Sequence, residues 1–177
     1  MTITGNFIGG KTVISSSNET MPVYDPATGK AVREVTVSTA QEVSEAIQVA
    51  RDAFDSWSRT TPLRRARVLF NFKMLLEQHV EELAGIIVSE HGKVWSDALG
   101  ELTRGMEVVE FACGIPHLIK GECSSDVGTG VDSYSLMQPL GVVAGITPFN
   151  FPAMVPMWMF PLALACGNSF VLKATPE

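Results

Sequence analysis

The residues best suited to chemistry lie near the ends of one uncharged stretch, Leu140 to Leu172. Asn150 stands between two phenylalanines, where an apolar, β-branched segment gives way to a proline-containing one. A side-chain amide between a strand and a helix can donate to a developing oxyanion, beside the free N–H groups of the helix. The same amide could instead cap the helix through an Asx-type turn. The pattern alone leaves both roles open.

Two charged residues follow the stretch. Lys173 and Glu177 come after the segment Ser169–Leu172, where a Rossmann-type parallel sheet binds its cofactor. A lysine and a glutamate can hold two ribose hydroxyls there, and the alternative is a pair of solvated loop charges. The sequence has neither a G-x-G-x-x-G nor a G-x-S-x-G motif. The residues alone therefore indicate the start of an α/β nucleotide-binding domain.

One arginine heads an apolar row on an upstream segment with helical periodicity. Arg104 lies in a helix predicted from about Val94 to Cys113 and shares a face with three apolar residues. One interpretation is a surface ion pair with Glu101 or Glu107, which would contribute little. The other is an anion anchor, because the planar guanidinium can bind a carboxylate through two hydrogen bonds.

The uncharged stretch predicts the β–α–β unit that positions Asn150. Gly141–Ile146 is typical of a parallel strand covered on both faces, and Ser169–Leu172 of the next strand. Pro152–Ala165 is apolar on nearly every side, which favours a buried helix that Pro156 and Pro161 kink or break. A membrane span is the alternative by length, since a bilayer needs about 20 apolar residues. The interrupting prolines and the lack of a flanking basic cluster favour the β–α–β unit, so we expect no membrane partner.

Hairpins and helices are predicted upstream from the periodicity of apolar residues and from turn and capping signals. In chain order we expect hairpins at Asn6–Ile14 and Val23–Val37, helices from Thr39 to about Ser58, from Thr61-Pro62 onward, at Val80–Glu90 and at Val94–Cys113, a polar loop at Lys120–Asp132, and a solvent-facing strand at Ser133–Gln138.

Composition narrows the classes of function. The formal net charge is −6 without a Lys/Arg run, which argues against a nucleic-acid partner. Three cysteines and three histidines lie at irregular spacings, so we expect neither a disulfide framework nor a metal site. The first residues lack a leader pattern, and we expect a cytoplasmic location. A two-stranded parallel sheet cannot cover itself, so the sequence is expected to be part of a longer chain.

The run VAGITPFNFPAMVPMWMFPLALACGNSFVLK closely resembles the aldehyde dehydrogenase superfamily, specifically the methylmalonate-semialdehyde dehydrogenases. Pro148–Pro152 reads PFNFP where most relatives have PWNFP, and the phenylalanine is typical of the semialdehyde enzymes. The resemblance extends upstream through QPLGVVAGI, Gly100-Glu101, Ser89–Lys93 (SEHGK) and Tyr24–Gly29, and so covers essentially the whole chain.

The resemblance implies an α/β fold, namely the N-terminal part of an aldehyde dehydrogenase-like fold. It implies hairpins and helices of the coenzyme domain at residues 1–132 and a strand of an oligomerisation ribbon at 133–140. Residues 141–177 would form the first β–α–β unit of a Rossmann-like NAD-binding sheet, and the catalytic domain would lie outside this chain.

The activity implied by the resemblance is NAD-dependent oxidation of methylmalonate or malonate semialdehyde. Carbon dioxide is lost and the acyl group passes to coenzyme A, giving propionyl-CoA or acetyl-CoA, in an enzyme expected to be a homo-oligomer (dimer or tetramer). By matching position, Asn150 is the oxyanion donor and Arg104 binds the substrate carboxylate. The family's catalytic cysteine is expected well beyond the position of Glu177, so the alternative is a non-enzymatic module that binds nucleotide weakly or pairs with full-length subunits.

Coenzyme residues are implied in the same way. Thr147 and Phe149 would line the coenzyme, and Lys173 would hold the adenosine ribose. The family usually has K-P-S-E where this chain reads KATPE, so Glu177 is displaced by one residue from the family's glutamate. That displacement weakens its match.

Overall fold

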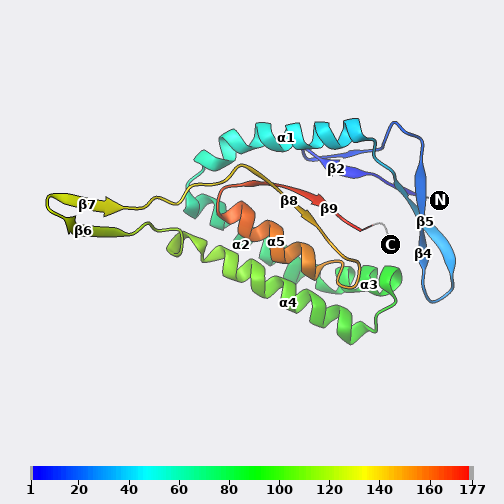
Figure 1. Cartoon of the computed structure of the whole chain (residues 1–177). Coiled ribbons are helices and arrows are strands. Elements are labelled where there is room, and N and C mark those ends of the chain that lie inside the picture. The colour runs from blue at the N-terminus through cyan, green and yellow to red at the C-terminus, as the bar shows by residue number, and fades with distance from the viewer. Residues whose placement is uncertain (1, 176–177) are drawn as a thin grey trace.

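The computed structural model describes residues 2–175 (Figure 1). Its elements are β1 (Ile3–Thr4), β2 (Asn6–Ile8), β3 (Lys11–Val13), β4 (Thr20–Asp25), β5 (Lys30–Thr36), α1 (Ala40–Arg59), α2 (Pro62–Gln78), α3 (Val80–His91), α4 (Trp95–Cys113), a 3-10 turn (Ile115–His117), β6 (Cys123–Gly128), β7 (Val131–Tyr134), β8 (Val142–Ile146), α5 (Met154–Ala165) and β9 (Ser169–Lys173).

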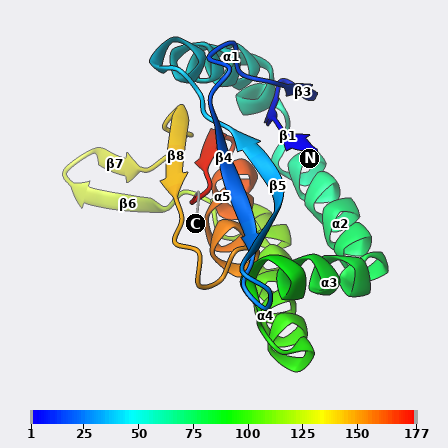
Figure 2. The same cartoon turned by 90° about the vertical axis from the view of Figure 1, so that its right-hand side faces the viewer.

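The apolar helix α5 lies between a pair of parallel strands and the helices α2 and α4 (Figures 1 and 2). β8 and β9 pair in parallel, with Val142 opposite Ser169 and Ile146 opposite Lys173. α5 packs on one face of this pair and α1 on the other, while α4 and α2 contact the far side of α5. The predicted β–α–β unit, with a helix on each face of its strands, is confirmed.

The prolines of α5 do not break it. The helix runs without interruption from Met154 to Ala165, with Pro161 in its interior. Pro156 is in the first turn, where a missing N–H removes no ladder hydrogen bond. The predicted break is therefore wrong, and the helix begins two residues after Pro152.

Close packing between α4 and α5 depends on a small residue. The buried face of α4 is almost entirely apolar or small and comprises Ala98, Glu101, Leu102, Gly105, Val109, Ala112 and Cys113. A Cβ atom added at Gly105 would overlap the Met157 side chain and lie 3.4 Å from the Met154 Cα. The absence of a side chain at Gly105 thus lets α4 approach the first turns of α5.

The N-terminal strands follow the predicted hairpins. β2 and β3 pair antiparallel, and β4 and β5 pair antiparallel with an irregularity between Val23 and Tyr24. β1, which the sequence pattern did not predict, adds to β5 in parallel and gives the sheet order β1-β5-β4. The helix boundaries agree with the expected ones to within a few residues, including the capping box at Thr39.

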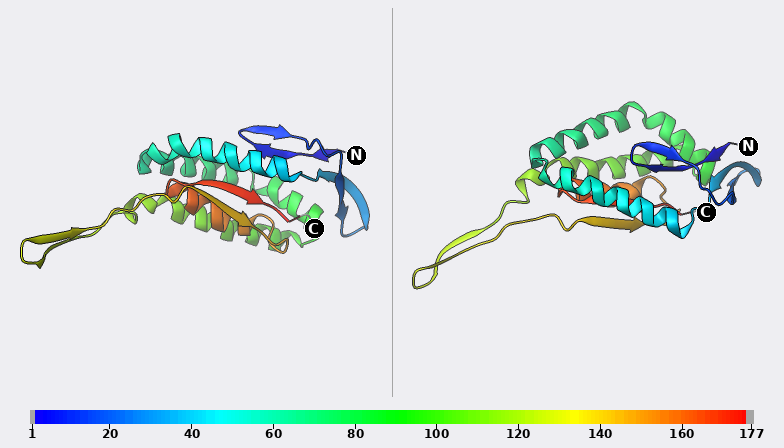
Figure 3. Two further views of the ribbon diagram at one scale, coloured as in Figure 1. Left: turned by 45° about the horizontal axis from the view of Figure 1, so that its top comes forward. Right: turned by 90° about the horizontal axis from the view of Figure 1, so that it is seen from above.

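The prediction for the segment before β8 is partly wrong. The expected polar loop Lys120–Asp132 forms most of a hairpin, in which β6 pairs antiparallel with β7, and only the first two residues of the expected strand Ser133–Gln138 belong to β7. Every residue of both strands is exposed, so no apolar alternation marks them in the sequence. The hairpin extends away from the helices in each view of Figures 1 and 3. The domain boundaries at 132/133 and 140/141 stay a prediction.

The uncharged stretch from residue 140 to 172 is divided among β8, α5 and β9. Within residues 2–175, no helix combines the length and the apolar character needed to cross a membrane.

Side chains from two other helices bind the carboxyl end of α5. Trp57 Nε1 donates to the Leu164 carbonyl at 3.0 Å, and Arg65 Nε donates to the Ala165 carbonyl at 2.9 Å. Arg65 also donates to the Thr60 carbonyl and is only 4% exposed. Burial lowers the pKa of Arg65. A cation at this position complements the negative end of the helix dipole, so Arg65 ties α2 to α5.

Glu42 ties the start of α1 to the segment after β3. Its carboxylate accepts hydrogen bonds from Ser15 Oγ at 2.7 Å, from the Ser16 amide at 2.7 Å and from the Thr39 amide at 2.9 Å. These bonds, the one from the Ser15 hydroxyl foremost, lower the pKa of Glu42 from 4.5 to about 2.

Replacing Arg65 by methionine is expected to lower the free energy of unfolding by about 2–3 kcal/mol, because charged hydrogen bonds to two carbonyls are lost. Urea unfolding at neutral pH measures this change. Arg64→Met is the matched control, because Arg64 is the adjacent and exposed arginine, and it should change stability by less than about 0.5 kcal/mol. Equal effects of the two substitutions would contradict the role given to Arg65.

Glu42 should make stability depend on pH. A carboxyl group with a lowered folded-state pKa stabilises the fold fully above its ordinary value of 4.5, and this contribution is lost as pH falls toward about 2. Glu42→Gln should therefore have a lower thermal midpoint than the parent at neutral pH, and the difference should shrink as the pH approaches 2. Glu45→Gln, on an exposed carboxylate of the same helix, should follow the parent profile. A difference for Glu42→Gln that stays constant with pH would refute the assignment.

Candidate functional site at the start of α5

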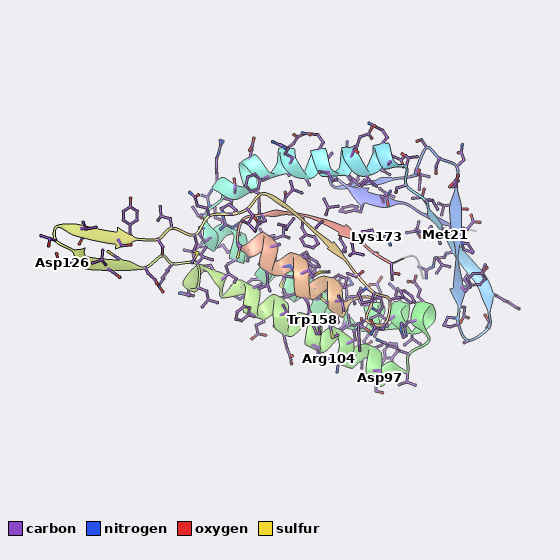
Figure 4. The ribbon with its side chains drawn as sticks, viewed as in Figure 1. Met21, Asp97, Arg104, Asp126, Trp158 and Lys173 are labelled. Carbon is purple, nitrogen blue, oxygen red and sulfur yellow. The ribbon has the colours of Figure 1, made fainter. Side chains whose placement is uncertain are left out.

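The carboxyl ends of the parallel strands bring Thr147 and Lys173 together. The Thr147 amide donates to the Lys173 carbonyl at 3.2 Å, and Lys173 with Ile146 forms the last residue pair of the two strands. Thr147 is buried, whereas the Lys173 side chain is exposed at the end of β9 (Figure 4). This is the edge where a Rossmann-type sheet binds its ligand. Glu177, the other residue predicted there, lies outside the described residues.

Asn150 is exposed in the loop between β8 and α5. Its backbone carbonyl accepts a hydrogen bond from Lys93 Nζ at 2.6 Å. Within residues 2–175 its side-chain amide makes no hydrogen bond, and Ala153, the residue that caps α5, has no side-chain cap either. The Asx-type capping role considered for Asn150 is therefore wrong, and its amide is directed to solvent.

The first N–H groups of α5 are already bound. Glu101 Oε1 accepts from the Ala153 amide at 2.8 Å and from the Met154 amide at 3.1 Å. The Val155 amide donates to the Phe151 carbonyl at 3.2 Å, and Pro156 has no N–H. The expectation of free helix N–H groups beside Asn150 is therefore wrong. An anion at this position would have to compete with the Glu101 carboxylate.

Glu101 is held by a buried ion pair. Lys93 Nζ lies 2.6 Å from Glu101 Oε2, and the two side chains are 10% and 0% exposed. Lys93 lies in the segment between α3 and α4, and Glu101 lies on the buried face of α4. The ion pair therefore joins that segment to the body of α4. A carboxylate at the amino end of α5 also complements the positive end of its dipole.

Two cations lie near the ring of Phe151. Lys93 Nζ is 3.9 Å from the centre of its ring, and the Arg104 guanidinium carbon is 5.7 Å from it. Arg104 projects from α4 near the start of α5 (Figure 4) and is exposed. In the described part of the chain it makes no ion pair, and Glu101 is bound to Lys93 instead. The predicted surface ion pair of Arg104 with Glu101 or Glu107 is therefore wrong, and the guanidinium faces solvent beside Phe151.

Phe149 packs against the end of α3. Its ring centre lies 5.4 Å from that of His91, with the ring planes inclined by 34°. Burial, followed by the charge of Lys93, lowers the pKa of His91, although Glu101 opposes the shift. These effects favour the neutral form of the imidazole that packs against Phe149.

The structure therefore gathers Asn150 and Arg104 around Phe151, and Thr147 and Lys173 at the end of the strand pair. Among residues 2–175, no three metal-ligating side chains lie together.

Sequence reasoning assigned no role of their own to Lys93 and Glu101, although both fall in motifs that carried the resemblance. A signal was present, because Glu101 lies three residues after Ala98 and four before Gly105, on the buried face of its helix. A carboxylate among apolar residues requires a buried partner.

Comparison with known proteins extends these observations. A model described as the aldehyde dehydrogenase family matches residues 13–177. A malonate-semialdehyde dehydrogenase of Geobacillus kaustophilus is 52% identical over 172 residues, which are 97% of this chain and 35% of that protein. The chain thus spans about a third of the length of the curated relatives it matches.

Solved structures agree with the fold. A methylmalonate-semialdehyde dehydrogenase from Oceanimonas doudoroffii superposes with a TM-score of 0.96 at 53% identity, covering 99% of this chain and 36% of the other. A second structure, described as a putative methylmalonate-semialdehyde dehydrogenase from Sinorhizobium meliloti complexed with NAD, gives a TM-score of 0.96 at 46% identity with the same coverage. The α/β fold and the resemblance inferred from sequence are both confirmed.

Proposed function

The chain belongs to the aldehyde dehydrogenase family, and we propose that it supplies part of an enzyme that oxidises malonate or methylmalonate semialdehyde. In this proposal NAD accepts the hydride, the acyl group passes to coenzyme A, and carbon dioxide is lost. The observation that carries the proposal is the similarity of nearly the whole chain to malonate-semialdehyde dehydrogenases. A cytoplasmic location is part of the proposal.

Asn150 is proposed as the oxyanion donor. When a thiolate adds to an aldehyde, negative charge develops on the carbonyl oxygen, and a preorganised donor stabilises that charge. The Asn150 amide has no partner within residues 2–175, so it is available to donate. The amides of Ala153 and Met154, at the start of the helix beside it, are bound to Glu101 and are therefore not available for this role.

Arg104 is proposed as the anchor for the substrate carboxylate. Malonate and methylmalonate semialdehydes carry a carboxylate close to the aldehyde, and a guanidinium can bind it with two parallel hydrogen bonds. The Arg104 side chain is exposed and makes no ion pair in the described residues. It lies beside the ring of Phe151, the residue that follows Asn150.

The coenzyme is proposed to bind at the carboxyl edge of β8 and β9. Lys173 presents an exposed ammonium that can donate to the adenosine ribose, with Thr147 beside it and Phe149 on the same loop. NAD fits this donor set through its ribose hydroxyls. The first turn of α5 does not fit a phosphate, because Glu101 occupies its N–H groups.

The β6–β7 hairpin and the segment to residue 140 are proposed to form an oligomerisation ribbon. All residues of both strands are exposed, among them the large apolar side chains of Val127, Val131 and Tyr134. The same projecting hairpin favours the alternative function, a non-enzymatic module that binds nucleotide weakly or pairs with longer subunits.

Arg104→Leu tests the proposed substrate class. In the native polypeptide that contains these residues, KM for malonate semialdehyde should rise about 10- to 100-fold, because charged hydrogen bonds to the carboxylate are lost. KM for propanal, which has no carboxylate, should stay within about threefold. NADH absorbance and the thioester product measure both reactions, and Arg67→Leu, at an exposed position of α2, is the control.

An equal rise of KM for both aldehydes would remove Arg104 from the substrate site. If the native polypeptide forms no NADH from either aldehyde, the proposed activity is wrong and the non-enzymatic alternative is favoured.

A further inference from the structure

We propose that Lys93 is a positioning residue, which holds the Asn150 loop so that the Asn150 amide points at the reacting oxygen. The inference rests on the proposed oxyanion role of Asn150. It assigns to the buried Lys93–Glu101 ion pair a role in catalysis, the positioning of the Asn150 amide, in addition to any role in stability.

Lys93 binds three partners with one ammonium group. Its Nζ atom lies 2.6 Å from Glu101 Oε2, 2.6 Å from the Asn150 carbonyl oxygen and 3.9 Å from the Phe151 ring centre. A lysine ammonium has three N–H donors and no acceptor, and this side chain is only 10% exposed, so these contacts replace most of its contact with water. Lys93 thus contacts both Asn150 and the residue that follows it.

Glu101 binds the other end of the same segment. While one carboxylate oxygen accepts from Lys93, the other accepts from the Ala153 and Met154 amides. Residues 150–154 are therefore held at both ends by a single ion pair, between Glu101 of α4 and Lys93 of the segment that precedes α4. Because the Asn150 side chain makes no bond of its own in the described residues, its direction depends on this backbone hold.

Precise placement matters for an oxyanion donor. The donor must lie about 2.7–3.1 Å from the oxygen on which charge develops, and displacements of about 1 Å cost large factors in rate. Glu101 neutralises the charge of Lys93, so Lys93 acts on the reaction through position rather than as a free cation. Loosening the loop should lower kcat and leave substrate binding at Arg104 nearly unchanged.

The test needs a variant that removes the hydrogen bond from Lys93 to the Asn150 carbonyl without leaving an unpaired buried charge. Lys93→Met alone would leave the Glu101 carboxylate unpaired, which is strongly destabilising. The double variant Lys93→Met/Glu101→Gln has no unpaired charge, and the glutamine oxygen can still accept from the Ala153 and Met154 amides. It removes the hydrogen bond to the Asn150 carbonyl. Lys73→Met/Glu77→Gln is the matched control, because that pair on α2 has the same 2.6 Å separation.

In the native polypeptide, the Lys93/Glu101 variant should lose at least about tenfold in kcat, with KM for malonate semialdehyde within about threefold. Asn150→Ala should lose about 100- to 1000-fold. Combining the two should give the loss of Asn150→Ala alone, since residues that act as a unit are not additive. The Lys73/Glu77 control should keep its kcat.

Additive losses, or an unchanged kcat in the Lys93/Glu101 variant, would overturn the inference. An unchanged kcat in Asn150→Ala, with an active parent, would instead overturn the proposed oxyanion role. If circular dichroism shows that the double variant is unfolded, the same cycle is measured with Lys93→Arg, which keeps a cation beside Glu101 but places its donors differently. Its loss of kcat should likewise disappear in the Asn150→Ala background, and an additive loss would overturn the inference.

Discussion

The structure depends on how the two ends of one apolar helix are bound. α5 carries no charged side chain, so its own residues cannot satisfy the backbone groups left free at its ends. Buried Glu101 from α4 binds the amino end, and buried Arg65 from α2 binds the carboxyl end. Both charges have the sign that complements the helix dipole. These contacts fix the β8–α5–β9 unit against the helical layer, and with it the loop that carries Asn150.

The proposed chemistry follows from this arrangement. A helix amino end is often an anion site, but in this chain a protein carboxylate already occupies it. The loop is thereby held in place, while its exposed Asn150 amide and the nearby Arg104 guanidinium of α4 stay available to a ligand. The Lys93–Glu101 pair and Arg65 thus serve the fold, whereas the Asn150 amide and the Arg104 guanidinium face solvent, where the proposed substrate would bind.

Much of the fold could be predicted from sequence, because a helix or strand that is buried on one face has apolar residues at regular spacings in the sequence. The capping box at Thr39 and the two apolar strands around α5 are local signals, and both are confirmed. The β6–β7 hairpin was missed because all of its residues are exposed and no alternation marks it. The Lys93–Glu101 pair was missed for another reason. Its partners lie on either side of a helix start, and their contact with the Asn150 loop spans more than fifty residues.

Amide hydrogen exchange at Ala153 and Met154 tests the central claim most directly, namely that Glu101 binds the start of α5. First-turn amides of a helix normally lack partners and exchange quickly. Trp95 and Ser96 provide the comparison within the molecule, since α4 begins without a side-chain cap. If Glu101 binds the two amides of α5, Ala153 and Met154 should exchange much more slowly than Trp95 and Ser96. Equally fast exchange at all four amides would contradict that claim.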